Sequence, residues 1–61
     1  MTTAERVNAA CAEIGREIGY RRAVYPRLVA QGKLSNEKAD AQIAALEDAA
    51  KLLRELSGVG R

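Results

Sequence analysis

The chain has 61 residues and a formal net charge of +2, and it contains one Cys, no His, no Phe and no Trp. A single Cys excludes an intrachain disulfide, and without His there are too few ligands for a zinc site, so we expect no metal and no cofactor. No apolar run reaches the roughly 18 residues of a membrane span, and no signal-peptide pattern is present. We therefore expect a cytoplasmic protein with no membrane partner.

The small size of the chain predicts a single domain that needs reinforcement. A domain of about 60 residues buries only about 60% of the surface of its unfolded chain, which leaves it marginally stable. Aromatic residues make up 3% of the sequence, and many of the apolar residues are alanines, which favour helices but bury little area. We therefore expect a homo-oligomer in which several copies share one core.

The first predicted helix begins with a capping box. Thr2 is the expected N-cap, and Glu5, three residues later, is placed to accept a hydrogen bond from the Thr2 amide. From Val7 onward, apolar residues recur at alternating four- and three-residue steps, which place them in one seam of the helix. Arg21 occupies a position in this seam and interrupts it.

The segment around Pro26 predicts how the first helix ends and the chain turns. Pro26 either kinks the helix or ends it and starts a short new segment, and we favour a kink because Leu28 and Val29 continue the apolar pattern. Gly32 is the expected left-handed residue after the helix, and Ser35 is the expected N-cap of the next one. So short a connection requires the two helices to fold back as an antiparallel hairpin.

The second predicted helix repeats the heptad spacing, and Gly58 is its expected C-cap, with Val59 folding back onto the helix. The prediction is an all-α fold: an antiparallel two-helix hairpin with a kink near Pro26, assembling into a homo-oligomeric helical bundle. One domain covers residues 1–61, with helices over about 3–31 and 36–57 and a turn over 32–35. The predicted oligomer core comprises Val7, Cys11, Ile14, Ile18, Leu28, Ile43, Leu46 and Leu53.

Positive charge gathers on the first helix and near the turn. Residues 1–33 contain six Lys and Arg against three acidic residues, whereas residues 34–61 contain four against five. Guanidinium groups bind phosphates through paired hydrogen bonds and Tyr rings stack on bases, so several copies together could hold a nucleotide or a nucleic-acid backbone. The candidate ligand-binding residues are Tyr20, Arg21, Arg22, Tyr25, Arg27 and Lys33.

The same residues also have a purely structural interpretation. In that interpretation Tyr25 fills the end of the hairpin, and Arg21 pairs with a carboxylate of the second helix, either Asp40 or Glu47. The other arginines are then solvated: Arg16, Arg22 and Arg27. Arg21 keeps both interpretations open, because an apolar residue at its seam position would stabilise more.

Catalysis is not expected. The absence of His removes the commonest general base, the carboxylates fall on solvated helix faces, and Cys11 has no neighbouring base to activate its thiol. We interpret Cys11 as a small buried apolar residue at a heptad position.

A block near the turn combines a run of arginines, Val-Tyr-Pro, an apolar pair, Gly-Lys-Leu-Ser and then Ala-Asp. With this block the chain resembles a family of small uncharacterised helical-hairpin proteins encoded by bacteriophages and prophages. The resemblance covers about residues 17–53, and it implies a location in the cytoplasm of a host cell but no particular activity. The matching residues are Arg21, Arg22, Val24, Tyr25, Pro26, Leu28, Val29, Gly32, Lys33, Leu34, Ser35, Ala39 and Asp40.

Three functional hypotheses follow. The leading one is a non-enzymatic phage-type accessory protein that acts by binding, either blocking a host protein or sequestering a small anionic ligand such as a nucleotide. The second is an accessory protein that binds nucleic acid through the basic first helix. The third is a purely structural oligomerisation module.

Overall fold

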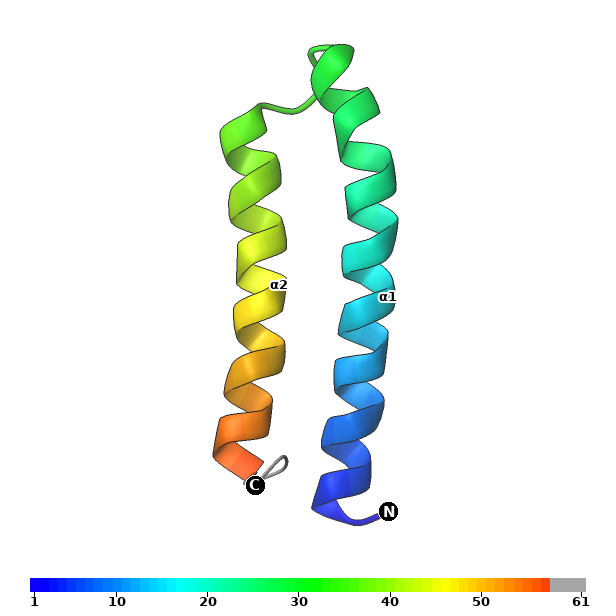
Figure 1. Ribbon diagram of the computed structural model, residues 1–61, viewed down its shortest axis with the longest axis vertical. Helices are drawn as coiled ribbons and strands as arrows, with labels where there is room; N and C mark the ends of the chain where they lie inside the picture. The colour runs from blue at the N-terminus through cyan, green and yellow to red at the C-terminus, as the bar shows by residue number, and fades with distance from the viewer. Residues whose placement is uncertain (58–61) are drawn as a thin grey trace.

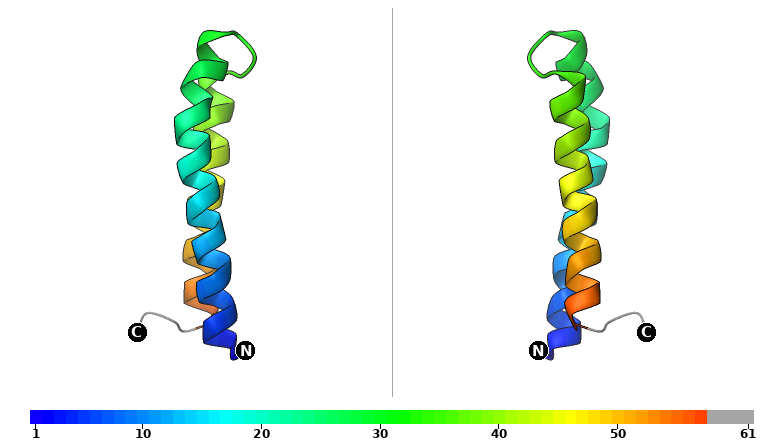
Figure 2. Two further views of the ribbon diagram at one scale, coloured as in Figure 1. Left: turned by 90° about the vertical axis from the view of Figure 1, so that its right-hand side faces the viewer. Right: turned by 90° about the vertical axis from the view of Figure 1, so that its left-hand side faces the viewer.

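The computed structural model of the protein is an antiparallel hairpin of two helices that lie side by side (Figures 1 and 2). Helix α1 spans Thr3–Ala30 and helix α2 spans Asn36–Ser57. The hairpin measures 43 × 17 × 13 Å, so it is a rod about two helices wide. The all-helical hairpin prediction is confirmed. The structure describes residues 1–57, so the predicted C-cap at Gly58 and Val59 lies outside the described residues.

The predicted capping box at the start of α1 is confirmed. The Glu5 amide donates to Thr2 Oγ1 at 3.1 Å, and the Thr2 amide donates to Glu5 Oε1 at 3.0 Å. These reciprocal bonds satisfy two of the amide groups that the first turn of a helix leaves without partners. The hydrogen bond from the Thr2 amide also lowers the pKa of the Glu5 carboxyl below its ordinary value.

Helix α1 continues through Pro26, which has no amide hydrogen and so leaves one carbonyl a turn earlier without its usual partner. The helix ends in a Schellman motif. The Gly32 amide donates to the Val29 carbonyl at 3.0 Å, and the Lys33 amide donates to the Leu28 carbonyl at 2.9 Å. Gly32 has a φ of +72°, so the predicted left-handed conformation is confirmed.

Helix α2 starts at a serine cap, as predicted. Ser35 Oγ accepts a hydrogen bond from the Lys38 amide at 3.1 Å, and the Ser35 carbonyl accepts from the Ala39 amide at 3.0 Å. Residues 31–35 therefore connect two capped helix ends, and this short connection sets the antiparallel arrangement.

The core of the hairpin is narrow. Among the described residues only Val7, Cys11, Ala39 and Ala50 are buried. Three of them form a cluster in which the Cys11 thiol lies 3.7 Å from the Ala50 carbonyl oxygen. The remaining residues of the predicted oligomer core are only half-buried: Ile14, Ile18, Leu28, Ile43, Leu46 and Leu53.

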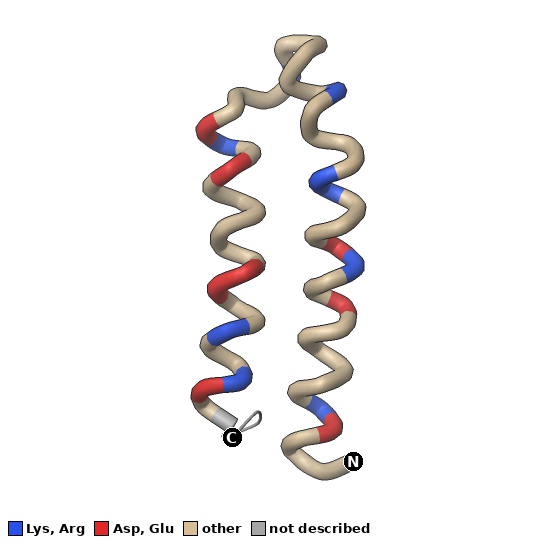
Figure 3. The backbone as a smooth tube through the Cα atoms, viewed as in Figure 1, with Lys and Arg blue, Asp and Glu red and all other residues tan. Residues whose placement is uncertain are grey.

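The two helices carry opposite charge balances (Figure 3). Helix α1 contains five Arg against three Glu, whereas α2 contains three Lys and Arg against five acidic residues. Opposite charges attract across an interface, so this asymmetry favours pairing of the two helices within the hairpin.

Candidate functional site

A polar network joins the helices near the turn. Tyr25 donates its hydroxyl hydrogen to Gln42 Oε1 at 2.6 Å, and Arg21 Nη1 donates to the same oxygen at 3.4 Å. The Arg21 guanidinium also lies 5.9 Å from the centre of the Tyr25 ring, within the range of a cation–π interaction. Arg21 and Tyr25 are four residues apart on α1, so they are neighbours one turn apart and both reach Gln42.

Arg21 has its carboxylate partner on its own helix. Its Nε lies 2.6 Å from Glu17 Oε1, and this hydrogen bond raises the pKa of the guanidinium above its ordinary value. The side chain of Arg21 is 28% exposed, so the ion pair is partly shielded from water. The prediction that Arg21 pairs with Asp40 or Glu47 is therefore wrong, because Glu17 lies one turn earlier on the same helix.

Arg22 makes the ion pair that crosses between the helices. Its Nη2 lies 2.8 Å from Glu47 Oε2, and both side chains are more than half exposed. An exposed pair of this kind contributes roughly 0–1 kcal/mol, so it orients the side chains more than it stabilises the fold. Arg22 and Arg16 are thus not simply solvated, since Arg16 pairs with Glu13 on the surface of α1.

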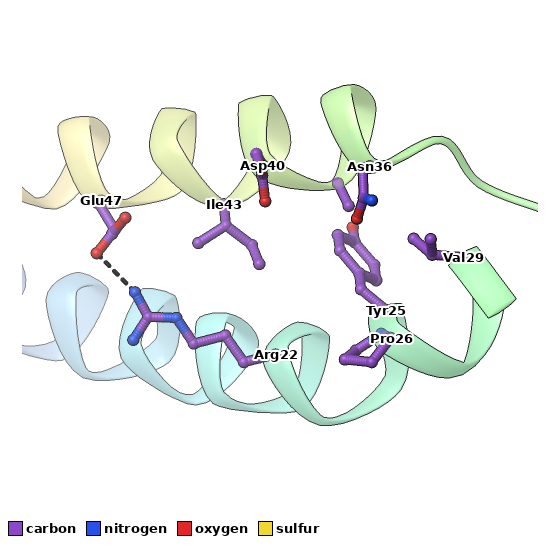
Figure 4. Close-up of a pocket in the computed structure, with 9 residues that line it drawn as sticks. Arg22, Tyr25, Pro26, Val29, Asn36, Asp40, Ile43 and Glu47 are labelled. Carbon is purple, nitrogen blue, oxygen red and sulfur yellow. Dashed lines mark hydrogen bonds and ion pairs between the residues drawn. The ribbon is translucent and has the colours of Figure 1, made fainter.

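An open groove lies between the helices near the turn (Figure 4). It has a volume of about 640 Å³, and we call it the turn groove. The Ile43 side chain points from α2 toward α1, while the Tyr25 ring points from α1 toward α2 (Figure 4). Its lining residues are Arg22, Tyr25, Pro26, Val29, Asn36, Ala39, Asp40, Ile43 and Glu47.

The charges of the turn groove do not favour an anionic ligand. The lining contains one guanidinium and two carboxylates, and the guanidinium of Arg22 already pairs with Glu47. Asp40 supplies the second carboxylate. Sequence reasoning missed Asp40 as a site residue, although its spacing of three from Ile43 and seven from Glu47 places these residues on one side of a helix.

The six predicted ligand-binding residues divide into two groups in the structure. Arg21, Arg22 and Tyr25 gather where the helices face each other, through Gln42 and Glu47. The others are exposed and do not line the turn groove: Tyr20, Arg27 and Lys33. The structure therefore does not bring the six together into one site.

Residues 1–57 contain neither a metal-binding cluster nor a membrane-spanning helix. The described residues contain no group of three or more His, Cys, Asp or Glu side chains placed to hold a metal ion. Within residues 1–57, neither helix combines the length and the apolar character that crossing a bilayer requires. Comparisons with protein-family models, curated proteins and solved structures give no match.

Proposed function

We propose that this chain is a non-enzymatic accessory protein of phage type, located in the host cytoplasm, that acts by binding as a homo-oligomeric helical bundle. One observation carries the part of the proposal that concerns assembly: the hairpin buries only four of its described side chains, and two of those are alanines. A protein built this way completes its core by contact with another chain.

The magnitudes support a requirement for a partner chain. Full burial of a Val or Leu side chain contributes about 1.5–3 kcal/mol, whereas ordering each residue costs about 1.5 kcal/mol. Val7 is the only large aliphatic residue among the four buried ones. A kink of α1 at Pro26 belongs to the same proposal, because the missing hydrogen bond would let the helix bend around a shared core.

A protein partner fits the geometry better than a small anionic ligand does. Arg21 and Arg22 already pair with Glu17 and Glu47, so an anion would have to displace a carboxylate from each guanidinium. The turn groove is also lined by the carboxylate of Asp40, which forms no ion pair within residues 1–57 and would repel a phosphate.

Native mass spectrometry of the purified 61-residue chain tests this proposal. We expect an oligomer whose mass is a whole multiple of 6.6 kDa, with no additional mass of nucleotide size. A monomer at every concentration would overturn self-association. An oligomer that carries nucleotide mass would instead favour sequestration of a small anionic ligand.

Two exposed cations favour binding of nucleic acid as a second candidate function. Arg27, in the last turn of α1, and Lys33, in the connection, form no ion pair within the part of the chain that the structure describes. Such cations would contact phosphates and release counterions.

Titration with a single-stranded oligonucleotide tests this second candidate. The double variant Arg27→Ala/Lys33→Ala should weaken binding at low salt by about tenfold or more, because roughly one counterion is released for each phosphate contact. The double variant Lys38→Ala/Lys51→Ala, which removes two exposed cations from α2, is the matched control and should bind nearly as the wild type does. Wild-type binding that does not change with salt would exclude this function.

A further inference from the structure

The hairpin has two open sides, and they differ in chemistry. One side is the turn groove, which is lined by Arg22, Pro26, Ile43 and Glu47 among others. A rotation of about 200° separates residues two positions apart on a helix, so the residues that follow these four by two positions face the opposite side of the hairpin. Those four residues are apolar: Val24, Leu28, Ala45 and Ala49. The same step from other lining residues reaches polar side chains, among them Lys38 and Gln42, so the opposite side is apolar only in part.

Two leucines extend this surface along α2. Leu52 follows Ala45 by seven residues and Leu56 follows Ala49 by seven, so each lies on the same side of the helix as its counterpart. Leu52 is 47% exposed and Leu56 is 85% exposed. We call the six residues together the apolar face: Val24, Leu28, Ala45, Ala49, Leu52 and Leu56.

The Arg21–Glu17 ion pair lies on the same side of α1 as the apolar face. The Arg21 guanidinium already donates hydrogen bonds to Glu17 and to Gln42. Gln42 Oε1 also accepts one from the Tyr25 hydroxyl. A covering chain would therefore not leave the guanidinium without a hydrogen-bond partner.

The accessible surface of the chain leaves an area that suits a dimer. The chain exposes 4546 Å². A compact monomer of 6.6 kDa is expected to expose about 3,900 Å², so the excess is about 650 Å² per chain. If two copies covered this excess on each other, they would bury about 1,300 Å² in total, within the roughly 1,200–2,000 Å² of stable interfaces.

We propose that a second copy of this chain docks on the apolar face, with the same face of each copy in contact across a two-fold axis. This inference rests on the proposed self-association and names its surface. A two-fold interface brings each patch against itself, and the six residues of the apolar face carry no charge. Two cations lie on the same side: Lys38, seven residues before Ala45, and Arg21, which is already paired with Glu17. The turn groove is lined by the Asp40 and Glu47 carboxylates and a single guanidinium, so its excess negative charge would meet itself across a two-fold axis.

Three arginine substitutions in the 61-residue chain test the inference by analytical ultracentrifugation and native mass spectrometry. Ala45→Arg places a charge on the apolar face, whereas Ala44→Arg places the same charge one residue away on the outer side of α2. Gly15→Arg tests the groove side, because Gly15 precedes Arg22 by seven residues and a Cβ there meets no atom within 4 Å. Ala44 and Ala45 are both exposed, so their variants should leave the hairpin itself folded, as circular dichroism would verify.

We expect Ala45→Arg to raise the dimer dissociation constant by at least about tenfold, while Ala44→Arg and Gly15→Arg associate as the wild type does. Dissociation by Gly15→Arg but not by Ala45→Arg would overturn the inference in favour of the groove side. A wild-type oligomer that all three variants preserve would overturn the apolar face while leaving self-association intact. A monomeric wild type would overturn the proposed function as well.

Discussion

The two halves of the hairpin are held together by different interactions. In the half near the chain start, Val7, Cys11 and Ala50 are buried together, and small side chains bring the helices into contact. In the half near the turn, long side chains span the helices through the Tyr25–Gln42 hydrogen bond and an exposed ion pair, although Ala39 is buried there too. We refer to these as the open half and the turn half.

The difference shows that apolar and polar contacts hold one short hairpin together in separate places. Apolar burial contributes most per residue where it excludes water, so we expect the open half to contribute more to the free energy of unfolding. Exposed polar links contribute less, and in the turn half an open groove lies beside them between the helices.

The largest effect is expected from breaking the open half. Val7→Asp places a carboxylate in the buried cluster and should lower the free energy of unfolding by about 3 kcal/mol, which is enough to unfold so small a protein. Urea denaturation followed by far-ultraviolet circular dichroism measures the change. Asn8→Asp is the matched control, because Asn8 is exposed and the same charge there should change stability by less than about 0.5 kcal/mol. Equal losses in both variants would show that the open half does not hold the fold.

Two glycine-to-alanine substitutions should have opposite signs. Gly32→Ala forces an alanine into a left-handed conformation with φ near +72° and should destabilise the protein by about 1–2 kcal/mol. Gly19→Ala lies inside α1 where an added Cβ meets no atom within 4 Å, so it should stabilise by about 1 kcal/mol. Thermal unfolding midpoints report both changes, and a shift of the same sign in both variants would contradict the assigned backbone conformations.

The polar contacts of the turn half should have a smaller effect. Tyr25→Phe removes the hydroxyl that donates to Gln42 and should cost about 0.5–1 kcal/mol, because the bond is only partly shielded from water. Tyr20→Phe removes the same group from a side chain that is 64% exposed and should leave the unfolding midpoint unchanged. If the two variants unfold alike, the Tyr25 hydroxyl does not link the helices in solution.

The smallest effect is the pH dependence of the capping box. The Thr2 amide lowers the pKa of Glu5 in the folded chain below its ordinary value of 4.5. The carboxylate therefore stabilises the protein above that ordinary value, and this contribution is lost as the pH falls through the lower folded-state pKa. We expect the unfolding midpoint of Glu5→Gln to lie slightly below that of the wild type at pH 7, and the difference to shrink as the pH falls below the ordinary pKa of the carboxyl. A difference that does not change with acidification would assign the effect to something other than charge.

The helix ends could be predicted from the sequence because their causes are local. Each cap acts within a few residues of chain, so the residue types alone specify its hydrogen bonds. The caps are Thr2 with Glu5, Ser35 with Lys38, and Gly32. Such motifs require no knowledge of how the helices pack.

The cross-helix contacts could not be predicted in the same way. Adjacent residues on a helix are rotated by about 100°, so Arg21 and Arg22 point to opposite sides of the hairpin. The seam pattern singled out Arg21, but the residue beside it is the one that pairs with Glu47. Heptad spacing identifies which residues face the other helix. It does not specify to which side of the contact between the helices each long side chain extends. The turn groove, which depends on that side, was missed for the same reason.

Because Cys11 is buried, the reactivity of its thiol reports on opening of the hairpin. This thiol is the only one in the chain, and it lies between the helices against the Ala50 carbonyl. A thiol reagent in solution reaches it when the open half separates, because a buried thiol is inert until it is exposed. When reclosing is fast relative to labelling, the rate of alkylation under native conditions measures the fraction of molecules in which the two helices are apart, without any engineered probe.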